Sequence, residues 1–208
     1  TIYWKKQMPL KIAIKDDFLP NPRKRRIAAL ASDLDNAWDS EEGDFYDYVE
    51  SDIRLNVDAV NQQMSELVGE EIYLTGSTQC TFNFYFDHGD DPVFVHHDEV
   101  DYIALIYLNE EYGPNDGVTL YRHKETGAMH RSEIAFGTTK ASENTESDEN
   151  YNFDSWEPYL FMNAKFNRLV MFEALYYHAA SPGFGHDKKT ARLCQVMHFL
   201  RRQNSKVT

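Results

Sequence analysis

From Ile72 onward the chain is a succession of short segments rich in β-branched and aromatic residues, interrupted by Gly, Asp and Asn. Segments of this length and composition predict strands. We expect strands near residues 72–75, 80–87, 93–97, 101–109, 117–122, 168–174 and 191–201. Because consecutive short strands pair most simply in antiparallel sheets, the pattern favours a sandwich or barrel.

The first seventy residues have a different pattern. An edge strand is expected within residues 1–15, where Ile12 and Ile14 alternate with other residues. Two helices are predicted from apolar residues at helical spacing: Ile27, Leu30, Ala31 and Leu34 after Pro22, and Ile53, Val57, Val60, Met64 and Leu67 within 53–68. The fold class is therefore α+β, in which residues 1–70 support a β core over residues 71–203.

Length and charge limit the classes of function. The 208 residues fit a single domain with a sizeable core, and 14% of them are aromatic. Acidic residues outnumber basic ones by 34 to 21, which gives a net charge of −13. Such a surface repels polyphosphates, which argues against a nucleic-acid partner and against nucleobase oxidation.

The sequence also carries an expectation about compartment. Cys80 and Cys194 are the two cysteines and form no CxxC pattern, so a reducing cytoplasm is the default. No run of about 18 apolar residues would span a bilayer, and residues 1–6 lack the apolar core of a signal peptide. We therefore expect a cytoplasmic protein with no membrane partner.

Residues 138–157 are acidic and contain few core-forming residues before Tyr151. One interpretation is a solvated, mobile loop. The other is a lid over a functional site, because long loops in compact domains are often functional.

His96 and Asp98 stand two positions apart in a predicted strand. Side chains at this spacing point to the same face, so the pair can bind one ion. His97 and Glu99 have the same spacing and point the other way, which leaves a second register open. We prefer the first register because Asp is the shorter carboxylate.

A third ligand must come from elsewhere in the chain, and His178 lies 80 positions after Asp98, next to the small residues Ala179 and Ala180. A buried histidine bonded to a backbone carbonyl is the alternative. Two histidines and one carboxylate on one side of an octahedral ion leave positions open for other ligands, as in non-haem Fe(II) oxygenases, although Zn, Mn and Ni would also bind.

Arg192 follows His178 by 14 positions and is surrounded by apolar residues. A guanidinium inside a strand is costly unless it is paired. No neighbour in the sequence offers an acid, so the partner is either the carboxylate of a ligand or an acid on another strand. Tyr85, on an earlier strand, is a candidate to add a hydroxyl to the same carboxylate, or is simply part of the core.

Together, His96-x-Asp98, His178 and Arg192 resemble the Fe(II)- and 2-oxoglutarate-dependent dioxygenases. Tyr107-Leu108-Asn109, followed by Gly117-Val118-Thr119, is similar to a stretch of the prolyl-4-hydroxylase-like branch. Asp116 stands where that branch usually has a first Gly, and Arg192 stands where animal prolyl hydroxylases use Lys.

Three further motifs are similar to a poorly characterised bacterial and phage subgroup: Asp17-Phe18-Leu19-Pro20, Tyr121-Arg122-His123 and Gly183-Phe184-Gly185. The resemblance covers about residues 16–200. It implies a double-stranded β-helix, the jelly roll also found in cupins.

The resemblance further implies that His96, Asp98 and His178 hold Fe(II) and that Arg192 binds the distal carboxylate of 2-oxoglutarate. The implied reaction uses O2, with ascorbate as a candidate stimulant, and releases succinate and CO2. Its substrate would be a peptide, amino acid or small metabolite that becomes hydroxylated. A non-catalytic jelly-roll module that binds a metal or an acidic metabolite is the alternative, because fold alone does not decide function.

Overall fold

The structure, a computed structural model, describes residues 11–31, 57–75, 80–87, 94–134 and 152–202, and the backbone of residues 35–36 and 47–50. The strands of these residues pair antiparallel in two sheets. The larger sheet has the order β1-β9-β6-β11-β5-β3-β2, with β4 also pairing β11, and the smaller has the order β10-β7-β8. The predicted combination of N-terminal helices with antiparallel sheets is confirmed.

The large sheet contains β1 (Ile12–Lys15), β2 (Asp35–Asn36), β3 (Asp47–Glu50), β4 (Ile72–Leu74), β5 (Cys80–Tyr85), β6 (Tyr102–Tyr107), β9 (Leu169–Glu173) and β11 (Arg192–Arg201). The small sheet contains β7 (Gly117–His123), β8 (Trp156–Asn163) and β10 (His178–Ala180). The helices are α1 (Pro22–Ala31) and α2 (Val57–Val68), with short 3-10 turns η2 (Arg131–Glu133) and η4 (Phe153–Ser155).

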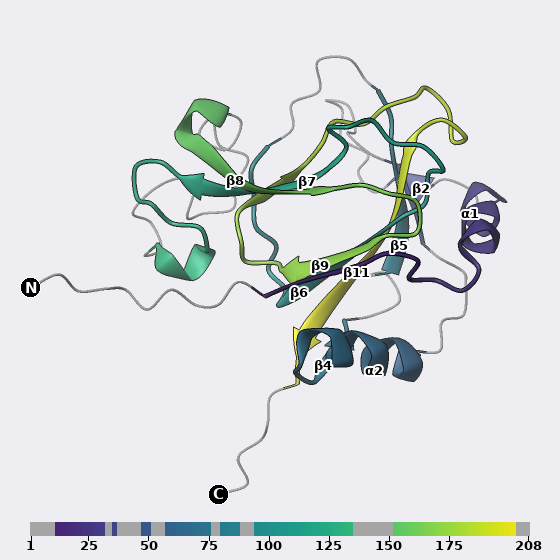
Figure 1. Ribbon diagram of the computed structural model, residues 1–208, viewed down its shortest axis with the longest axis horizontal. Coiled ribbons are helices and arrows are strands. Elements are labelled where there is room, and N and C mark those ends of the chain that lie inside the picture. The colour runs from purple at the N-terminus through teal and green to yellow at the C-terminus, as the bar shows by residue number, and fades with distance from the viewer. Residues whose placement is uncertain are drawn as a thin grey trace, which may run out of the picture.

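The central strands of the large sheet are buried on both faces, because their alternate side chains enter two different cores. In β6, Tyr102 and Ala104 belong to the core on the helix side, whereas Ile103 and Tyr107 pack toward the small sheet. Figure 1 shows the corresponding layers: β7 and β8 lie on one side of the large sheet and α2 lies on the other.

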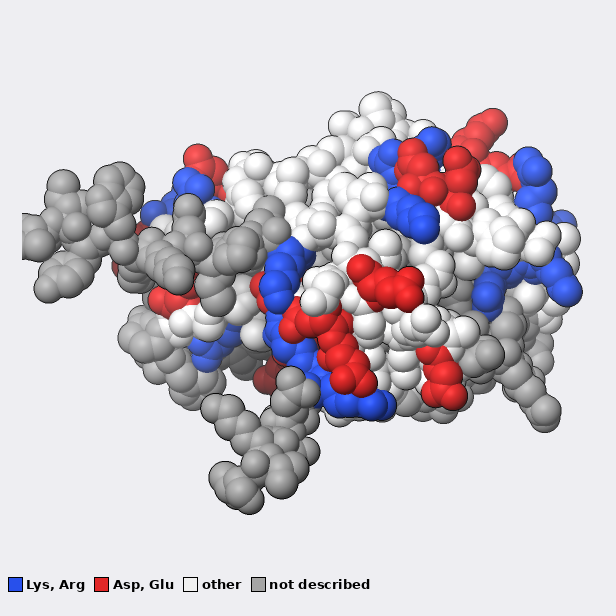
Figure 2. All heavy atoms as spheres, turned by 60° about the horizontal axis from the view of Figure 1, so that its bottom comes forward, with Lys and Arg blue, Asp and Glu red and all other residues white. Residues whose placement is uncertain are grey.

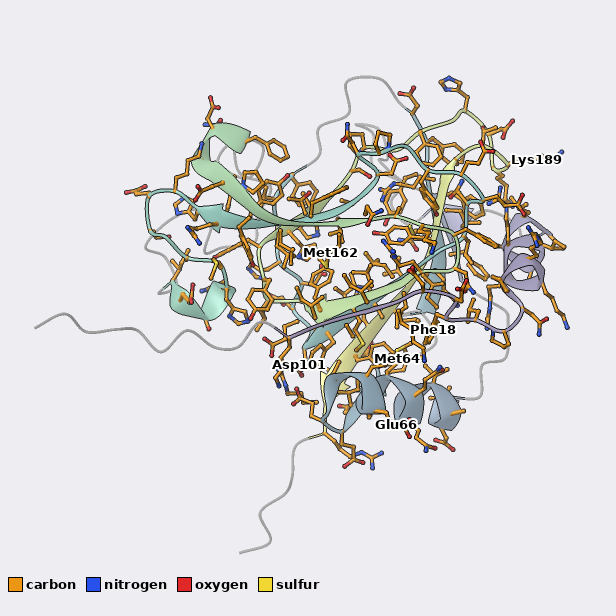
Figure 3. All side chains as sticks on the ribbon, in the orientation of Figure 1. Phe18, Met64, Glu66, Asp101, Met162 and Lys189 are labelled. Carbon is orange, nitrogen blue, oxygen red and sulfur yellow. The ribbon has the colours of Figure 1, made fainter. Side chains whose placement is uncertain are left out.

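Side chains labelled in Figure 3 mark these two cores: Met162 lies between the sheets, and Phe18 and Met64 lie between the large sheet and α2. A functional site in the interior of this fold would therefore lie between the two sheets.

The two helices cover the large sheet to different extents. In α2, Met64 is buried and Val60 and Leu67 pack beside it, as predicted, but Val57 is exposed. In α1 the predicted apolar face is only partly confirmed: Leu30 packs against the core, but Ile27 is 66% exposed and Ala31 is also exposed. Ala29 is the buried residue of this helix, and Leu34 lies outside the described residues.

The orientation of α1 has a polar cause. Arg26 donates hydrogen bonds to the carbonyls of Leu108 (3.2 Å) and Lys189 (2.7 Å), so the side of the helix that carries Arg26 faces the protein. At about 100° of rotation per residue, Ile27 then turns toward solvent. None of the helices in the described part of the chain is long and apolar enough to cross a bilayer.

Two predicted features fall partly outside this description. The segment predicted as a strand over 93–97 has a single β-bridge at His96. Residues 138–151 of the acidic segment lie outside the described residues, and residues 152–157 form η4 and the start of β8.

Candidate active site

Backbone pairing brings the two parts of the candidate metal site together. His96 and His178 form an isolated antiparallel bridge, with the His96 N–H donating to the His178 carbonyl (2.9 Å) and the His178 N–H donating back (2.7 Å). The Asp98 N–H donates to the carbonyl of Ala174 at 2.9 Å. Because His96 and Asp98 are two residues apart in an extended segment, both side chains point to the face where His178 lies.

The three side chains converge on one small volume. Nε2 of His178 lies 3.4 Å from Oδ2 of Asp98, and Nε2 of His96 lies 3.8 Å from Oδ1 of the same carboxylate. Their ligand atoms all lie within 4.8 Å of one another. The His178 side chain is 4% exposed, against 28% for His96 and 26% for Asp98, so the cluster opens to solvent on the side of the latter two.

Both imidazoles are oriented by backbone carbonyls. Nδ1 of His178 lies 2.8 Å from the carbonyl of Tyr176, and Nδ1 of His96 lies 3.3 Å from that of Phe94. A carbonyl only accepts, so the proton of each neutral ring is on Nδ1 and the lone pair is on Nε2. Such contacts hold metal-binding histidines in the tautomer and orientation that a metal requires.

Electrostatics favour the deprotonated, metal-binding forms. Burial, together with the neighbouring His178, lowers the pKa of His96 to about 4. Burial alone would raise the pKa of Asp98, but its close contact with His178 and its electrostatic attraction to both histidines outweigh burial and hold this pKa below its ordinary range. At neutral pH the Asp98 carboxylate and the neutral His96 imidazole therefore both present lone pairs to the same small volume. A bound cation or a proton would bridge them.

The alternative register does not converge in this way. The His97 side chain is buried on the other face, where its ring lies edge-on to Tyr177 at 5.9 Å, and Glu99 is exposed. The structure therefore brings together His96, Asp98 and His178, and not His97 and Glu99.

Arg192 is the first residue of β11 and pairs with Tyr85 of β5. It is 3% exposed, and its Cζ lies 4.0 Å from the centre of the Tyr85 ring. Its Nε is buried and has no hydrogen-bond partner among the described residues, which also contain no acid ion-paired with Arg192. The Tyr85 hydroxyl accepts a hydrogen bond from Asn83 at 3.1 Å, so this tyrosine meets the guanidinium through its ring.

Tyr107 belongs to the same interior and was not singled out as a site residue from the sequence. Its side chain is fully buried toward the small sheet, and its hydroxyl has no hydrogen-bond partner among the described residues. Burial raises the pKa of Tyr107, a rise that the charge of Arg192 partly offsets, so the hydroxyl keeps its proton and can donate it. Its place in Tyr107-Leu108-Asn109 was the signal that could have identified it.

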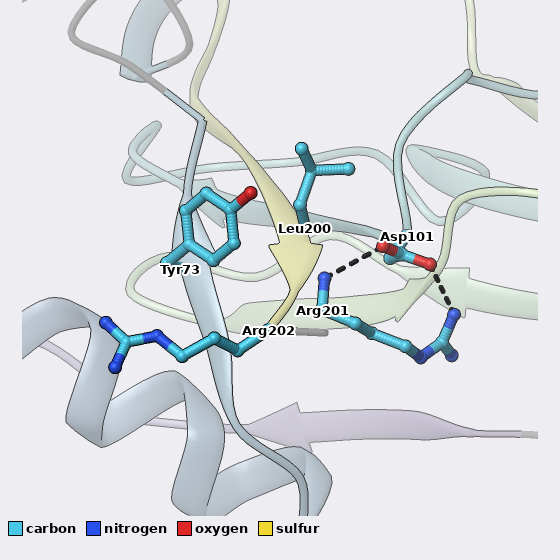
Figure 4. Close-up of a pocket in the computed structure, with 5 residues that line it drawn as sticks. All are labelled: Tyr73, Asp101, Leu200, Arg201 and Arg202. Atoms are coloured by element: carbon cyan, nitrogen blue, oxygen red, sulfur yellow. Dashed lines mark hydrogen bonds and ion pairs between the residues drawn. The ribbon is translucent and has the colours of Figure 1, made fainter. Parts of the chain in front are cut away.

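A hollow of about 480 Å³ lies elsewhere, lined by Tyr73, Asp101, Leu200, Arg201 and Arg202 (Figure 4). It is at the far end of β11, about 30 Å along the strand from Arg192 at 3.3 Å per residue. Arg201 is ion-paired with Asp101 and Glu70, and Arg202 with Glu71. With its cations already paired, this hollow offers less for a charged ligand than the space between the sheets.

No protein-family model matches the sequence, and no curated protein matches it. Solved structures do match. The non-haem α-ketoglutarate-dependent epimerase SnoN, from nogalamycin biosynthesis, superposes with a TM-score of 0.60 over 92% of this chain and 79% of SnoN, at 12% identity. HygX of Streptomyces hygroscopicus, solved with nickel, 2-oxoglutarate and hygromycin B, gives a TM-score of 0.57 over 93% of this chain and 84% of HygX, at 13% identity.

A prolyl hydroxylase of Trichoplax adhaerens, in complex with a hypoxia inducible factor peptide, gives a TM-score of 0.53 over 91% of this chain and 83% of its own, at 14% identity. The chain has the fold of the 2-oxoglutarate-dependent oxygenases. This confirms the predicted resemblance at the level of the fold.

Proposed function

We propose that this chain is an Fe(II)- and 2-oxoglutarate-dependent oxygenase that hydroxylates a peptide, an amino acid or a small metabolite, with release of succinate and CO2. One observation carries the proposal: a His-Asp-His cluster lies against the core between the two sheets, and a buried guanidinium with no acid partner among the described residues lies on the same side of the large sheet. In this proposal the two sheets are those of a double-stranded β-helix, supported by the N-terminal strand and helices in one domain.

The donor set fits a divalent metal. Two imidazole nitrogens and one carboxylate from His96, Asp98 and His178 suit Fe(II), and their placement on one side leaves coordination positions for a chelating co-substrate and O2. When bound, the iron supplies the oxidative chemistry that no side chain can provide. The carboxylate of Asp98 also argues against halogenation, which needs that position for a halide.

The anion site fits a dicarboxylate. Among the described residues, neither the buried Nε of Arg192 nor the hydroxyl of Tyr107, on the same side of the large sheet, has a hydrogen-bond partner, so both can bind a ligand. A carboxylate between them would accept charge-assisted hydrogen bonds and neutralise the buried charge. The Tyr85 ring supports the guanidinium through a cation–π contact.

The proposed substrate class remains broad, because likeness in fold does not transfer a substrate. The net charge of −13 argues for a substrate other than nucleic acid. The small number of cysteines suits a reducing cytoplasm, which we propose as the compartment.

The decisive assay measures succinate formed from 2-oxoglutarate with Fe(II), O2 and ascorbate, without added substrate. We expect slow turnover that disappears in His178→Ala and persists in His97→Ala, a matched control on the neighbouring strand segment. Tight binding of Zn(II) without any succinate would instead support a non-catalytic metal-binding module.

A further inference from the structure

We propose that Asn109 and Tyr112 are positioning residues for Arg192: they hold the backbone on both sides of it and thereby set the affinity for the distal carboxylate of 2-oxoglutarate. This inference rests on the proposed function and deepens it. Neither residue touches the metal cluster through any contact found among the described residues.

The need for such residues follows from where β6 stops. The last paired residues of β6 and β11 are Tyr107 and Cys194, and one more hydrogen bond joins the Leu108 N–H to the Leu193 carbonyl at 3.0 Å. At Arg192, strand β11 still pairs with β5 through Tyr85. On its other edge the backbone ladder from β6 has ended.

Asn109 continues that ladder with its side chain. Its Oδ1 accepts from the Leu193 N–H at 2.7 Å, and its Nδ2 donates to the Ala191 carbonyl at 2.8 Å. These two partners are the residues on either side of Arg192. A primary amide carries the same donor and acceptor as a peptide group, so the buried Asn109 side chain acts as one more residue of the missing strand.

Tyr112 fixes Asn109 in turn. The Tyr112 hydroxyl accepts from the Asn109 N–H at 2.9 Å and lies 3.1 Å from Asn109 Oδ1 and 3.2 Å from the Leu193 carbonyl. Its ring lies edge-on to that of Tyr107, with the centres 5.6 Å apart. Tyr112 thus connects the backbone next to Arg192 with the ring of the second proposed carboxylate donor.

Arg192 depends on this support because its own side chain has few anchors. Its Nε has no hydrogen-bond partner among the described residues, and the contact of the guanidinium with the Tyr85 ring is less directional than a hydrogen bond. The position of the guanidinium is therefore set largely by the backbone at residues 191–193. Binding groups hold their geometry when packing and supporting hydrogen bonds fix it.

The test is calorimetric titration of 2-oxoglutarate into the full chain loaded with Mn(II), which binds the co-substrate without turnover. We expect Asn109→Ala to raise the Kd for 2-oxoglutarate about tenfold, and Tyr112→Phe to raise it less, as for other supporting hydrogen bonds. 2-Oxobutyrate has the same keto-acid end but lacks the distal carboxylate. Its Kd should be unchanged in both variants.

Asn167→Gly is the matched control. Asn167 is equally buried and also bridges a backbone N–H and carbonyl, those of Leu19, by 2.8 Å and 2.9 Å bonds. Its loss should leave the Kd for 2-oxoglutarate unchanged. In an Arg192→Met background the effect of Asn109→Ala should also vanish, because there is no guanidinium left to position.

Equal weakening of 2-oxoglutarate and 2-oxobutyrate, or wild-type affinity in both variants, would overturn the positioning role while leaving the proposed function intact. Failure of the wild type to bind 2-oxoglutarate would overturn both. Should Asn109→Ala fail to fold, Tyr112→Phe removes one hydroxyl only and decides the question alone.

Discussion

The guanidinium carbon of Arg192 lies 4.0 Å from the centre of the Tyr85 ring, deep between strands that carry no acid paired with it among the described residues. A buried charge without a partner is costly, and a cation–π contact returns only part of that cost, about 1–2 kcal/mol. The protein therefore maintains an unfavourable charge at this position, which is expected where a ligand completes the site.

Replacing Arg192 with an uncharged residue should have opposite effects on the stability of the protein and on its affinity for 2-oxoglutarate. We expect Arg192→Met to leave the ligand-free protein equally stable or more stable by about 1 kcal/mol, since an unpaired ion leaves the interior. The same variant should weaken 2-oxoglutarate binding on the order of 100-fold, because the carboxylate loses its charged partner. Thermal unfolding without ligand and calorimetry measure the two effects. Strong destabilisation would instead identify Arg192 as half of a structural ion pair.

The two histidine registers make opposite predictions for metal binding. Asp98→Ala should weaken Mn(II) or Co(II) binding about 100-fold, since it removes one of three converging ligands. His97→Ala should keep the metal and lose about 1–2 kcal/mol of stability, because its ring is buried against Tyr177. Metal titration and urea unfolding give both values. Loss of metal in His97→Ala with retention in Asp98→Ala would support the other register.

The strands that could be predicted are those whose own apolar residues identify them, whatever strands they pair with. β6 and β9 are runs of mostly apolar residues buried on both faces, and β11 is a longer, largely buried strand in which apolar residues predominate. β8 was missed because Glu157 and Pro158 interrupt it and most of its side chains are not fully buried, and β10 has only three residues. The orientation of α1 depends on what Arg26 meets across the interface, and no periodicity encodes that.

The metal cluster was predictable to the extent that strand geometry determines it. Two residues at i and i+2 share a face, so His96 and Asp98 follow from spacing. The choice of His178 depended on its small neighbours Ala179 and Ala180 and on the combined pattern of candidate ligands. Tyr107 could not be assigned in this way, because an aromatic residue in a strand is ordinarily part of the core. Beyond its place in the Tyr107-Leu108-Asn109 motif, its hydroxyl is distinguished by packing, which leaves it buried without a hydrogen-bond partner among the described residues.

An ionic network around Glu70 should shape the acid stability of the protein. Glu70 is bonded to Lys11, Tyr102 and Arg201. Burial tends to raise its pKa, but the hydrogen bonds from these three groups outweigh it and lower the pKa of Glu70 to about 2. Figure 2 shows Lys and Arg side chains interleaved with Asp and Glu on the face toward which α2 lies.

Because the folded-state pKa of Glu70 is below the unfolded value of 4.5, the folded protein binds this proton less readily than the unfolded chain. The stability from Glu70 is therefore fully present above about pH 4.5 and is lost as the pH falls toward about 2. Glu70→Gln should lower the free energy of unfolding at pH 7 by about 1–3 kcal/mol and flatten its decline below pH 5. Urea unfolding at several pH values tests this, with the exposed Glu66→Gln as a control that keeps the wild-type slope.

The motif Gly183-Phe184-Gly185 should be needed for close packing against the backbone of Tyr85, the residue that pairs with Arg192. A Cβ added at Gly183 would lie 2.1 Å from the Phe86 carbonyl oxygen, and the next residue donates its N–H to the Tyr85 carbonyl at 3.3 Å. We expect Gly183→Ala to cost about 2 kcal/mol of stability, because backbone must move, and to weaken 2-oxoglutarate binding by displacing Tyr85. Gly127→Ala, where φ is +72° but no atom lies within 4 Å, should cost about 1 kcal/mol through strain alone and leave binding unchanged. Equal effects of the two substitutions on binding would show that the packing at Gly183 does not support the site.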